Sequence, residues 1–174
     1  MYRDVVAVGK STHRASMVVP SVRLARLIGQ LSGNITKVII DSIGFDGSDF
    51  RVPVDNDLMF GALMYTITTA SYLDLRRQGF DVSALRYEDL VAQPLDMCRV
   101  ILEFCHLPVS LAELGVKAFD VDSQRNSVFA ESIIGHFKEP ALTPEIELKL
   151  NVLLKKFCLP LIGEPGIIEG TLSC

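Results

Sequence analysis

Positive charge is scarce in this sequence. Its 174 residues include 17 Lys and Arg against 21 Asp and Glu, which gives a formal net charge of −4. The basic residues are scattered along the chain, so no stripe of positive charge is available to displace counterions from a phosphate backbone. The composition therefore excludes nucleic acid as an expected partner.

Cysteine pairs with metal or redox spacing are also missing. The four cysteines form no CxxC motif, and no histidine stands at zinc-finger distance from them. We expect reduced thiols and no metal. Two of the four lie seven residues apart in a predicted helix, so we expect them to share one helix face and to pack as small hydrophobes. The cysteines are Cys98, Cys105, Cys158 and Cys174.

Long apolar runs are absent as well. The longest uncharged stretch, Leu58 to Leu73, is shorter than the roughly 20 apolar residues of a membrane span and contains several threonines. A buried helix explains it better. Arg3, Asp4 and Lys10 interrupt the start of the chain before an apolar leader could form, so we predict no secretory signal and a cytoplasmic location.

The composition that remains is that of one globular domain. Hydrophobic residues make up 49% and charged residues 22% of the chain, which predicts a single core. Asp4 is a predicted helix N-cap, and Val82 to Tyr87 is the best candidate strand; Thr36 to Ile40 is either a strand or packed coil, followed by a loop over Ser42 to Asp57. The predicted helices run from Val5 to about Ser16, Pro20 to about Leu31, Asp57 to about Gln78, Pro94 to about Cys105, Leu111 to Phe119 and Pro144 to Phe157.

A glycine-lysine pair near the start resembles a nucleotide-binding loop only superficially. Gly9 and Lys10 are followed by Ser11 and Thr12, as at the end of a Walker A motif. That motif requires a glycine five residues before the pair, where this chain has Asp4. The spacing therefore excludes a P-loop triphosphatase.

An arginine and a serine eight residues apart in the same segment indicate a candidate phosphate-binding site. Arg3 ends a short apparent strand, an acidic turn follows, and the next helix carries Ser11. A guanidinium and a hydroxyl placed in this way can converge on one phosphate group. The nearby helix N-terminus adds a favourable dipole for an anion.

Three segments of the chain resemble the sulfotransferases that use 3′-phosphoadenosine 5′-phosphosulfate. The Arg3-to-Ser11 segment is similar to that family's arginine, helix and serine motif, although Val5 replaces the family's proline. Phe80 to Leu90, with its Tyr-Glu-Asp-Leu turn and a proline-led helix behind it, resembles the next family segment. Gly135 to Lys138 is similar to the family's Gly-Asp-Trp-Lys segment.

The resemblance implies roles for four residues. Arg3 and Ser11 would hold the 3′-phosphate of the cofactor, and Tyr87 would lie close to the adenine; a structural tyrosine at a strand end is an equal alternative. The family's lid triplet falls near Ala130 to Ser132, which supplies no guanidinium. Arg125, in a polar patch, is the nearest substitute, and a plain surface arginine is as reasonable an interpretation.

The resemblance also implies a fold. It predicts an α/β protein, the helix-rich C-terminal portion of a three-layer, P-loop NTPase-like sulfotransferase fold with an incomplete parallel sheet. Residues 1–157 would be a partial sulfotransferase domain, and residues 158–174 an extended C-terminal tail. In relatives the 5′-phosphosulfate loop and the catalytic base lie upstream of the Arg3 segment, so we expect no catalytic residue within this sequence.

Three functional hypotheses follow. The first is transfer of a sulfuryl group from 3′-phosphoadenosine 5′-phosphosulfate to a hydroxyl or amine acceptor, with the chain as given truncated and inactive. The second is a non-catalytic binding module that keeps part of the 3′-phosphoadenosine pocket. The third is an unrelated, mostly helical scaffold. The sequence does not identify the acceptor, and it marks none of the histidines, His13, His106 and His136, as a general base.

Overall fold

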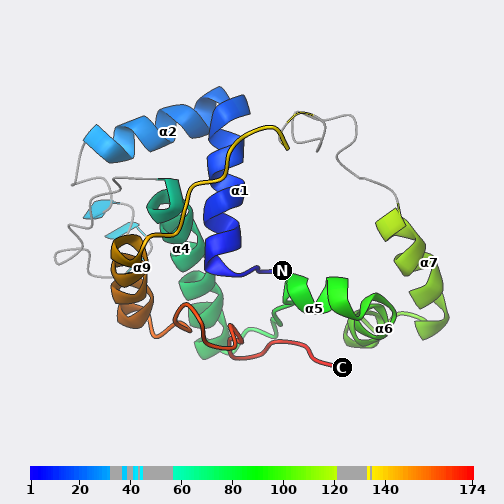
Figure 1. Ribbon diagram of the computed structural model, residues 1–174. Helices are drawn as coiled ribbons and strands as arrows, with labels where there is room; N and C mark the ends of the chain where they lie inside the picture. The colour runs from blue at the N-terminus through cyan, green and yellow to red at the C-terminus, as the bar shows by residue number, and fades with distance from the viewer. Residues whose placement is uncertain (32–36, 39–40, 43, 45–56, 121–132, 134) are drawn as a thin grey trace.

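A computed structural model of the chain describes residues 1–31, 37–38, 41–42, 44, 57–120, 133 and 135–174. This part of the protein is helix-rich (Figure 1). Its α-helices are α1 (Val5–Val18), α2 (Pro20–Leu31), α4 (Asp57–Arg77), α5 (Tyr87–Ala92), α6 (Pro94–Phe104), α7 (Ala112–Lys117) and α9 (Pro144–Lys156). Two 3-10 turns, η1 (Val109–Leu111) and η2 (Ala118–Asp120), flank α7.

Most of the predicted helices are confirmed. The ends of α2, α4, α6 and α9 lie within about one residue of the positions predicted from proline, glycine and charge, and α1 runs two residues beyond Ser16. Asp4 caps α1 as expected, because its carboxylate accepts the amide hydrogens of Val6 at 2.9 Å and Ala7 at 3.1 Å. Thr143 caps α9 in the same way through the amide of Ile146.

The core of the protein lies where α4 packs between α1 and α9. Helix α4 is the predicted buried helix, and most of its side chains are enclosed. Helix α9 contributes the three leucines Leu150, Leu153 and Leu154, which are almost completely buried. Apolar side chains of both helices join Val5, at the start of α1, in one cluster.

Helices α1 and α4 approach each other most closely at two glycines. A Cβ on Gly61 would lie 3.0 Å from the backbone nitrogen of Gly9, closer still to its Cα, and 3.1 Å from Thr12 Oγ1. A Cβ on Gly9 would lie 2.8 Å from Leu58 Cδ2. Gly9, which the sequence presents beside Lys10 as in a phosphate loop, therefore serves helix packing.

The predicted strand at Val82 to Tyr87 is wrong for the described residues. Only two isolated parallel bridges occur there, one between Tyr2 and Arg86 and one between Ala84 and Thr171. The pairing stops because α1 begins three residues after Tyr2 and because Tyr87 opens α5. No strand is present in the described ranges, so the incomplete parallel sheet is reduced to these two bridges.

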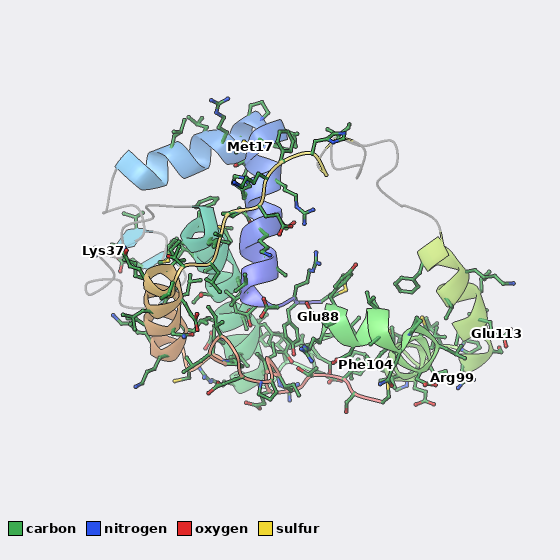
Figure 2. The ribbon with its side chains drawn as sticks, in the orientation of Figure 1. Met17, Lys37, Glu88, Arg99, Phe104 and Glu113 are labelled. Atoms are coloured by element: carbon green, nitrogen blue, oxygen red, sulfur yellow. The ribbon has the colours of Figure 1, made fainter. Side chains whose placement is uncertain are left out.

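Helices α5, α6 and α7 form an arm beside the α1, α4 and α9 body (Figures 1 and 2). Helix α6 packs closely on α7, where a Cβ on Gly115 would lie 3.2 Å from Cys98 Sγ.

Cys98 is half-buried in the interface between α6 and α7. Cys105 lies just beyond the end of α6 and is exposed, so the prediction of a shared buried face is wrong for Cys105. All four cysteines are free.

The C-terminal tail lies partly in the core. Residues 160–174 lack helix, as predicted, but Ile168 is buried rather than lying on the surface. The hydroxyl of Tyr72 donates to the carbonyl of Glu169 at 3.0 Å, and Arg76 Nη1 donates to the carbonyl of Val82 at 2.6 Å. These contacts attach the tail and the 80–86 segment to the end of α4.

Several other predictions fall partly outside the described residues or are only partly confirmed. Within Thr36 to Ile40, the described residues Lys37 and Val38 are helical, so strand and coil are both wrong for these two. The predicted helix over 111–119 is broken into η1, α7 and η2. The polar patch 122–127, with Arg125, and most of the predicted loop 42–57 lie outside the described residues.

Candidate functional site: the Arg3 and Tyr87 contact

The segment before α1 is fixed beside the start of α5 by two backbone hydrogen bonds. Tyr2 N–H donates to the carbonyl of Leu85 at 2.8 Å, and Tyr87 N–H donates to the carbonyl of Tyr2 at 2.8 Å. The next residue, Arg3, is therefore placed next to the first residue of α5. Arg3 and Tyr87, which are 84 residues apart in sequence, are thereby brought together.

The guanidinium of Arg3 lies over the ring of Tyr87. Its Cζ is 4.2 Å from the ring centroid, a cation–π contact worth roughly 0.5–1 kcal/mol at a half-exposed position. Arg3 Nε is buried and has no hydrogen-bond partner, and no ion pair joins Arg3 to any carboxylate of the described residues. The site therefore offers a positive charge that is held in place by an aromatic ring rather than neutralised.

The acidic and basic neighbours of Arg3 are engaged with other groups. Arg86 pairs with Glu88 at 3.7 Å and with Asp89 at 3.2 Å. Glu88 Oε1 also accepts the backbone amide of Asp4 at 3.1 Å, and the Asp4 carboxylate caps α1. Because the first amides of α1 already bond to Asp4, an anion at this site would bind to the guanidinium of Arg3 rather than to those amides.

Two cavities adjoin Arg3. One, of about 40 Å³, lies between Arg3, Arg86 and the turn that contains Glu164, and it is far smaller than the roughly 300–1,000 Å³ of small-molecule sites. The other, of about 280 Å³, opens between the N-terminal segment, α1 and α4 and is lined by Arg3, Tyr65 and Thr68 among others. The larger of the two is the accessible approach to Arg3.

Ser11 is exposed on α1 and takes no part in the Arg3–Tyr87 contact. It lines a separate cavity of about 480 Å³ together with Thr12, Phe60 and Met64. At a rise of 1.5 Å per residue, Ser11 lies about 9 Å along the helix from Val5. The two cavities share Met64 as a lining residue. Arg125, the fourth predicted site residue, lies outside the described residues.

Tyr65 lines both cavities beside Arg3 and has a strongly shifted pKa. Burial raises the pKa of its hydroxyl from 10.0 to about 12; a hydrogen bond with Thr69 acts in the opposite direction, and the nearby Tyr2, Asp4 and Glu88 raise the pKa further. In the unfolded chain this hydroxyl would ionise at its ordinary pKa. The neutral phenol is therefore the form that the folded protein holds.

We predict that stability falls as the pH rises from about 10 to about 12. Below this range Tyr65 is neutral in both states; within it the unfolded state loses the proton and the folded state keeps it, so alkali favours unfolding. Ultraviolet titration of tyrosinate should show one late step that Tyr65→Phe removes and Tyr72→Phe retains. A titration of Tyr65→Phe identical to that of the wild type would contradict the assignment.

A cluster that the sequence did not reveal lies on the other side of α1. Glu139 pairs with Lys10 at 2.8 Å and with Arg14 at 3.5 Å, and His13 Nε2 donates to the carbonyl of Lys138 at 3.1 Å. The hydrogen bond from Lys10 lowers the pKa of Glu139. These contacts hold the segment that precedes α9 against α1; Figure 1 shows the course of that segment. Residues about 125 apart carry no local sequence signal of such a contact.

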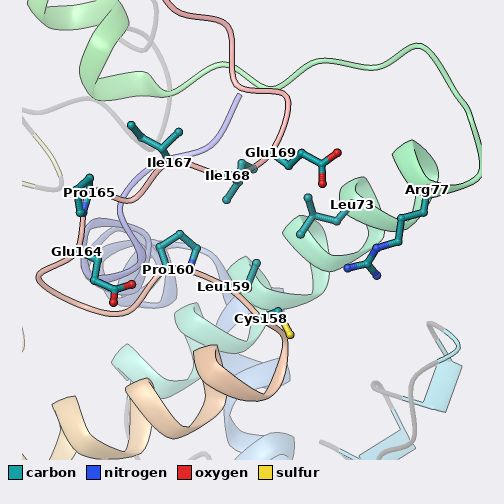
Figure 3. Close-up of a pocket in the computed structure, with 10 residues that line it drawn as sticks. All are labelled: Leu73, Arg77, Cys158, Leu159, Pro160, Glu164, Pro165, Ile167, Ile168 and Glu169. Atoms are coloured by element: carbon teal, nitrogen blue, oxygen red, sulfur yellow. The ribbon is translucent and has the colours of Figure 1, made fainter.

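A hollow of about 610 Å³ is formed by the tail and the end of α4 (Figure 3). Arg77 and Leu73 face it from α4, and Glu164 and Glu169 from the tail. Cys158, at its rim, has a φ of 54°, a left-handed conformation at the end of α9. Arg3, Ser11 and Tyr87 do not line this hollow.

In the described ranges, no three His, Cys, Asp or Glu side chains are grouped so that they could hold a metal ion. None of the helices described is both long enough and apolar enough to cross a bilayer. Comparison of the chain with protein-family models, curated proteins and solved structures finds no match.

Proposed function

We propose that this chain is a sulfotransferase-family protein that binds the 3′-phosphoadenosine end of 3′-phosphoadenosine 5′-phosphosulfate at Arg3 and Tyr87. The observation that carries the proposal is the guanidinium of Arg3, which lies over the Tyr87 ring without an ion pair among the described residues. Both residues belong to the segments that resemble the family. The activity that this resemblance implies is sulfuryl transfer to a hydroxyl or amine acceptor.

The chemistry of the two side chains suits a nucleotide phosphate. A guanidinium donates two parallel, charge-assisted hydrogen bonds to phosphate oxygens and keeps its charge at every physiological pH. The ring of Tyr87 fixes the plane of that guanidinium on one side. Tyr87 is itself only half-buried, so part of its ring remains available to an adenine base.

Transfer would depend on positioning and on charge neutralisation. An in-line displacement needs the acceptor oxygen or nitrogen, the sulfur and the bridging oxygen to be aligned, and it needs donors where negative charge develops. Arg3 and Tyr87 would contribute by anchoring the far end of the donor molecule. They are binding residues in this proposal and touch neither the sulfur nor the acceptor.

We predict that Arg3→Gln weakens binding of 3′-phosphoadenosine 5′-phosphate by about 10- to 100-fold, because a hydrogen bond to a charged group contributes roughly 1.5–3 kcal/mol. Ser11→Ala should weaken binding far less than Arg3→Gln, because Ser11 lines the neighbouring cavity and takes no part in the Arg3–Tyr87 contact. Isothermal calorimetry measures both. Arg99→Gln is the matched control, because Arg99 is an exposed arginine on α6 that pairs only with Asp96 within the described structure.

Adenosine 5′-monophosphate, which lacks the 3′-phosphate, serves as the second ligand. The proposal requires weaker binding of this ligand and little effect of Arg3→Gln upon it. Equal affinity of wild type and Arg3→Gln for 3′-phosphoadenosine 5′-phosphate would overturn the assignment. A transfer assay with labelled donor and a panel of phenols, alcohols, amines and sugars then distinguishes an enzyme from a binding module without chemistry.

A further inference from the structure

Two apolar hollows lie next to each other along the α1–α4 pair, and we refer to them together as the groove. Its two hollows, of about 480 Å³ and 280 Å³, share Met64 as a wall, and each is close to or within the roughly 300–1,000 Å³ of small-molecule sites. Helix α1 follows the groove for about 10 Å between Val8 and Ala15. Phe60 lines the hollow at one end, and Arg3 lines the hollow at the other.

The threonine hydroxyls in the middle of the groove need no hydrogen bond from a ligand. The hydroxyl of Thr12 donates to the carbonyl of Val8 at 2.8 Å, and the hydroxyl of Thr68 donates to the carbonyl of Met64 at 2.9 Å. Because both hydroxyls bond within their own helices, a ligand here meets mainly methyl and methylene groups. Met64 is 43% exposed, and its unbranched thioether adapts readily to a flexible chain.

One end of the groove carries a positive charge. Arg3 lines the hollow there, and no carboxylate of the described residues forms an ion pair with it. An apolar channel that ends at a cation is complementary to an alkyl chain that ends in an anion. An extended peptide suits it less well, because its backbone amides would find no partners along the middle of the groove.

We propose that this groove binds a free long-chain carboxylate as a single molecule. The carboxylate bonds to Arg3, and the alkyl chain passes Met64 toward Phe60. The inference does not depend on nucleotide binding, but both ligands use Arg3. A long-chain carboxylate therefore competes with 3′-phosphoadenosine 5′-phosphate if the chain binds both.

The test uses the whole chain and sodium dodecanoate below its micellar concentration, measured by calorimetry. We expect saturable binding of one molecule that weakens about fourfold for each methylene removed in decanoate and octanoate. Arg3→Gln should weaken binding of dodecanoate about tenfold and should not weaken binding of dodecyltrimethylammonium, whose cation Arg3 repels. Met64→Glu should weaken binding of dodecanoate at least tenfold, because it places a carboxylate in the middle of the groove.

Leu148→Glu is the matched control, since Leu148 is an exposed apolar residue of α9 that does not line the groove. Absence of saturable dodecanoate binding, or binding that Met64→Glu leaves unchanged, would overturn the proposal. Binding to phosphatidylserine vesicles without binding to dodecanoate would instead assign the groove to a membrane surface. Dodecanoate binding without nucleotide binding refutes the proposed function alone, and the reverse result refutes this inference alone.

Discussion

The Gly61→Ala protein is expected to unfold with a free energy about 2 kcal/mol below that of the wild type. Helix propensity alone predicts the opposite, because alanine stabilises a helix interior by roughly 1 kcal/mol relative to glycine. The added Cβ, however, would meet the backbone of Gly9 and the side chain of Thr12. Backbone atoms cannot rotate away, so α1 and α4 must separate.

That separation affects more than one contact. Helices α1 and α4 form the most extensive helix pair in the described structure, and overpacking at a close interface costs about 3 kcal/mol at the upper end of its usual range. Subtracting the gain in helix propensity leaves the expected net loss. Urea unfolding followed by far-ultraviolet circular dichroism measures it.

Gly166→Ala is the control for this substitution. A Cβ on Gly166 meets no atom within 4 Å, and Gly166 does not have a positive φ. We expect it to leave the stability unchanged or slightly raised, because alanine restricts the unfolded chain. If Gly61→Ala were stabilising by the same amount, the close approach of α1 and α4 would be wrong.

Leu154→Ala is expected to lower the free energy of unfolding by about 3 kcal/mol. Leu154 has no exposed surface and belongs to the cluster that α9 shares with α4 and α1. Removing a buried leucine side chain loses its transfer free energy and leaves a cavity, which together cost about 2–5 kcal/mol. Thermal and urea denaturation both report the loss.

Leu148→Ala makes the same chemical change on the exposed side of α9. Leu148 is 67% exposed, so we expect a change within about 0.5 kcal/mol. A comparable loss in both variants would mean that α9 faces the core differently from the structure described above. A small loss in both would mean that α9 contributes little to the fold.

Local chemistry explains which helices were predictable. The cap at Asp4, the prolines at the first positions of α2, α6 and α9, and the basic end of α4 each act within one turn of their own helix. Helix α5 was missed because its first residue was assigned to the predicted strand and the next residues to the turn in the resemblance. The strand was wrong because pairing depends on partners far away, Tyr2 and Thr171.

In the candidate site, too, local features were predictable from the sequence and long-range contacts were not. The resemblance gave Arg3 and Tyr87 separate roles, and the contact between them was not predicted, since no periodicity connects residues so far apart. Ser11 was expected beside Arg3 from spacing alone, whereas the helical rise carries it to the neighbouring cavity. Gly9 looked like a phosphate-loop residue, and only the packing against Gly61 reveals what the small side chain does.

The two parallel bridges impose an order on biosynthesis. Residues 2, 84, 86 and 171 meet at one place, so the beginning, the middle and the end of the chain must all be present before that junction is complete. On a ribosome, Tyr2 can pair with Leu85 once the middle of the chain has emerged. The amide of Leu172 reaches the carbonyl of Ala84 only after translation has passed the tail. Pairing between residues so far apart in sequence is slow relative to helix formation. A nascent chain would therefore form its helices before it forms the bridges at this junction.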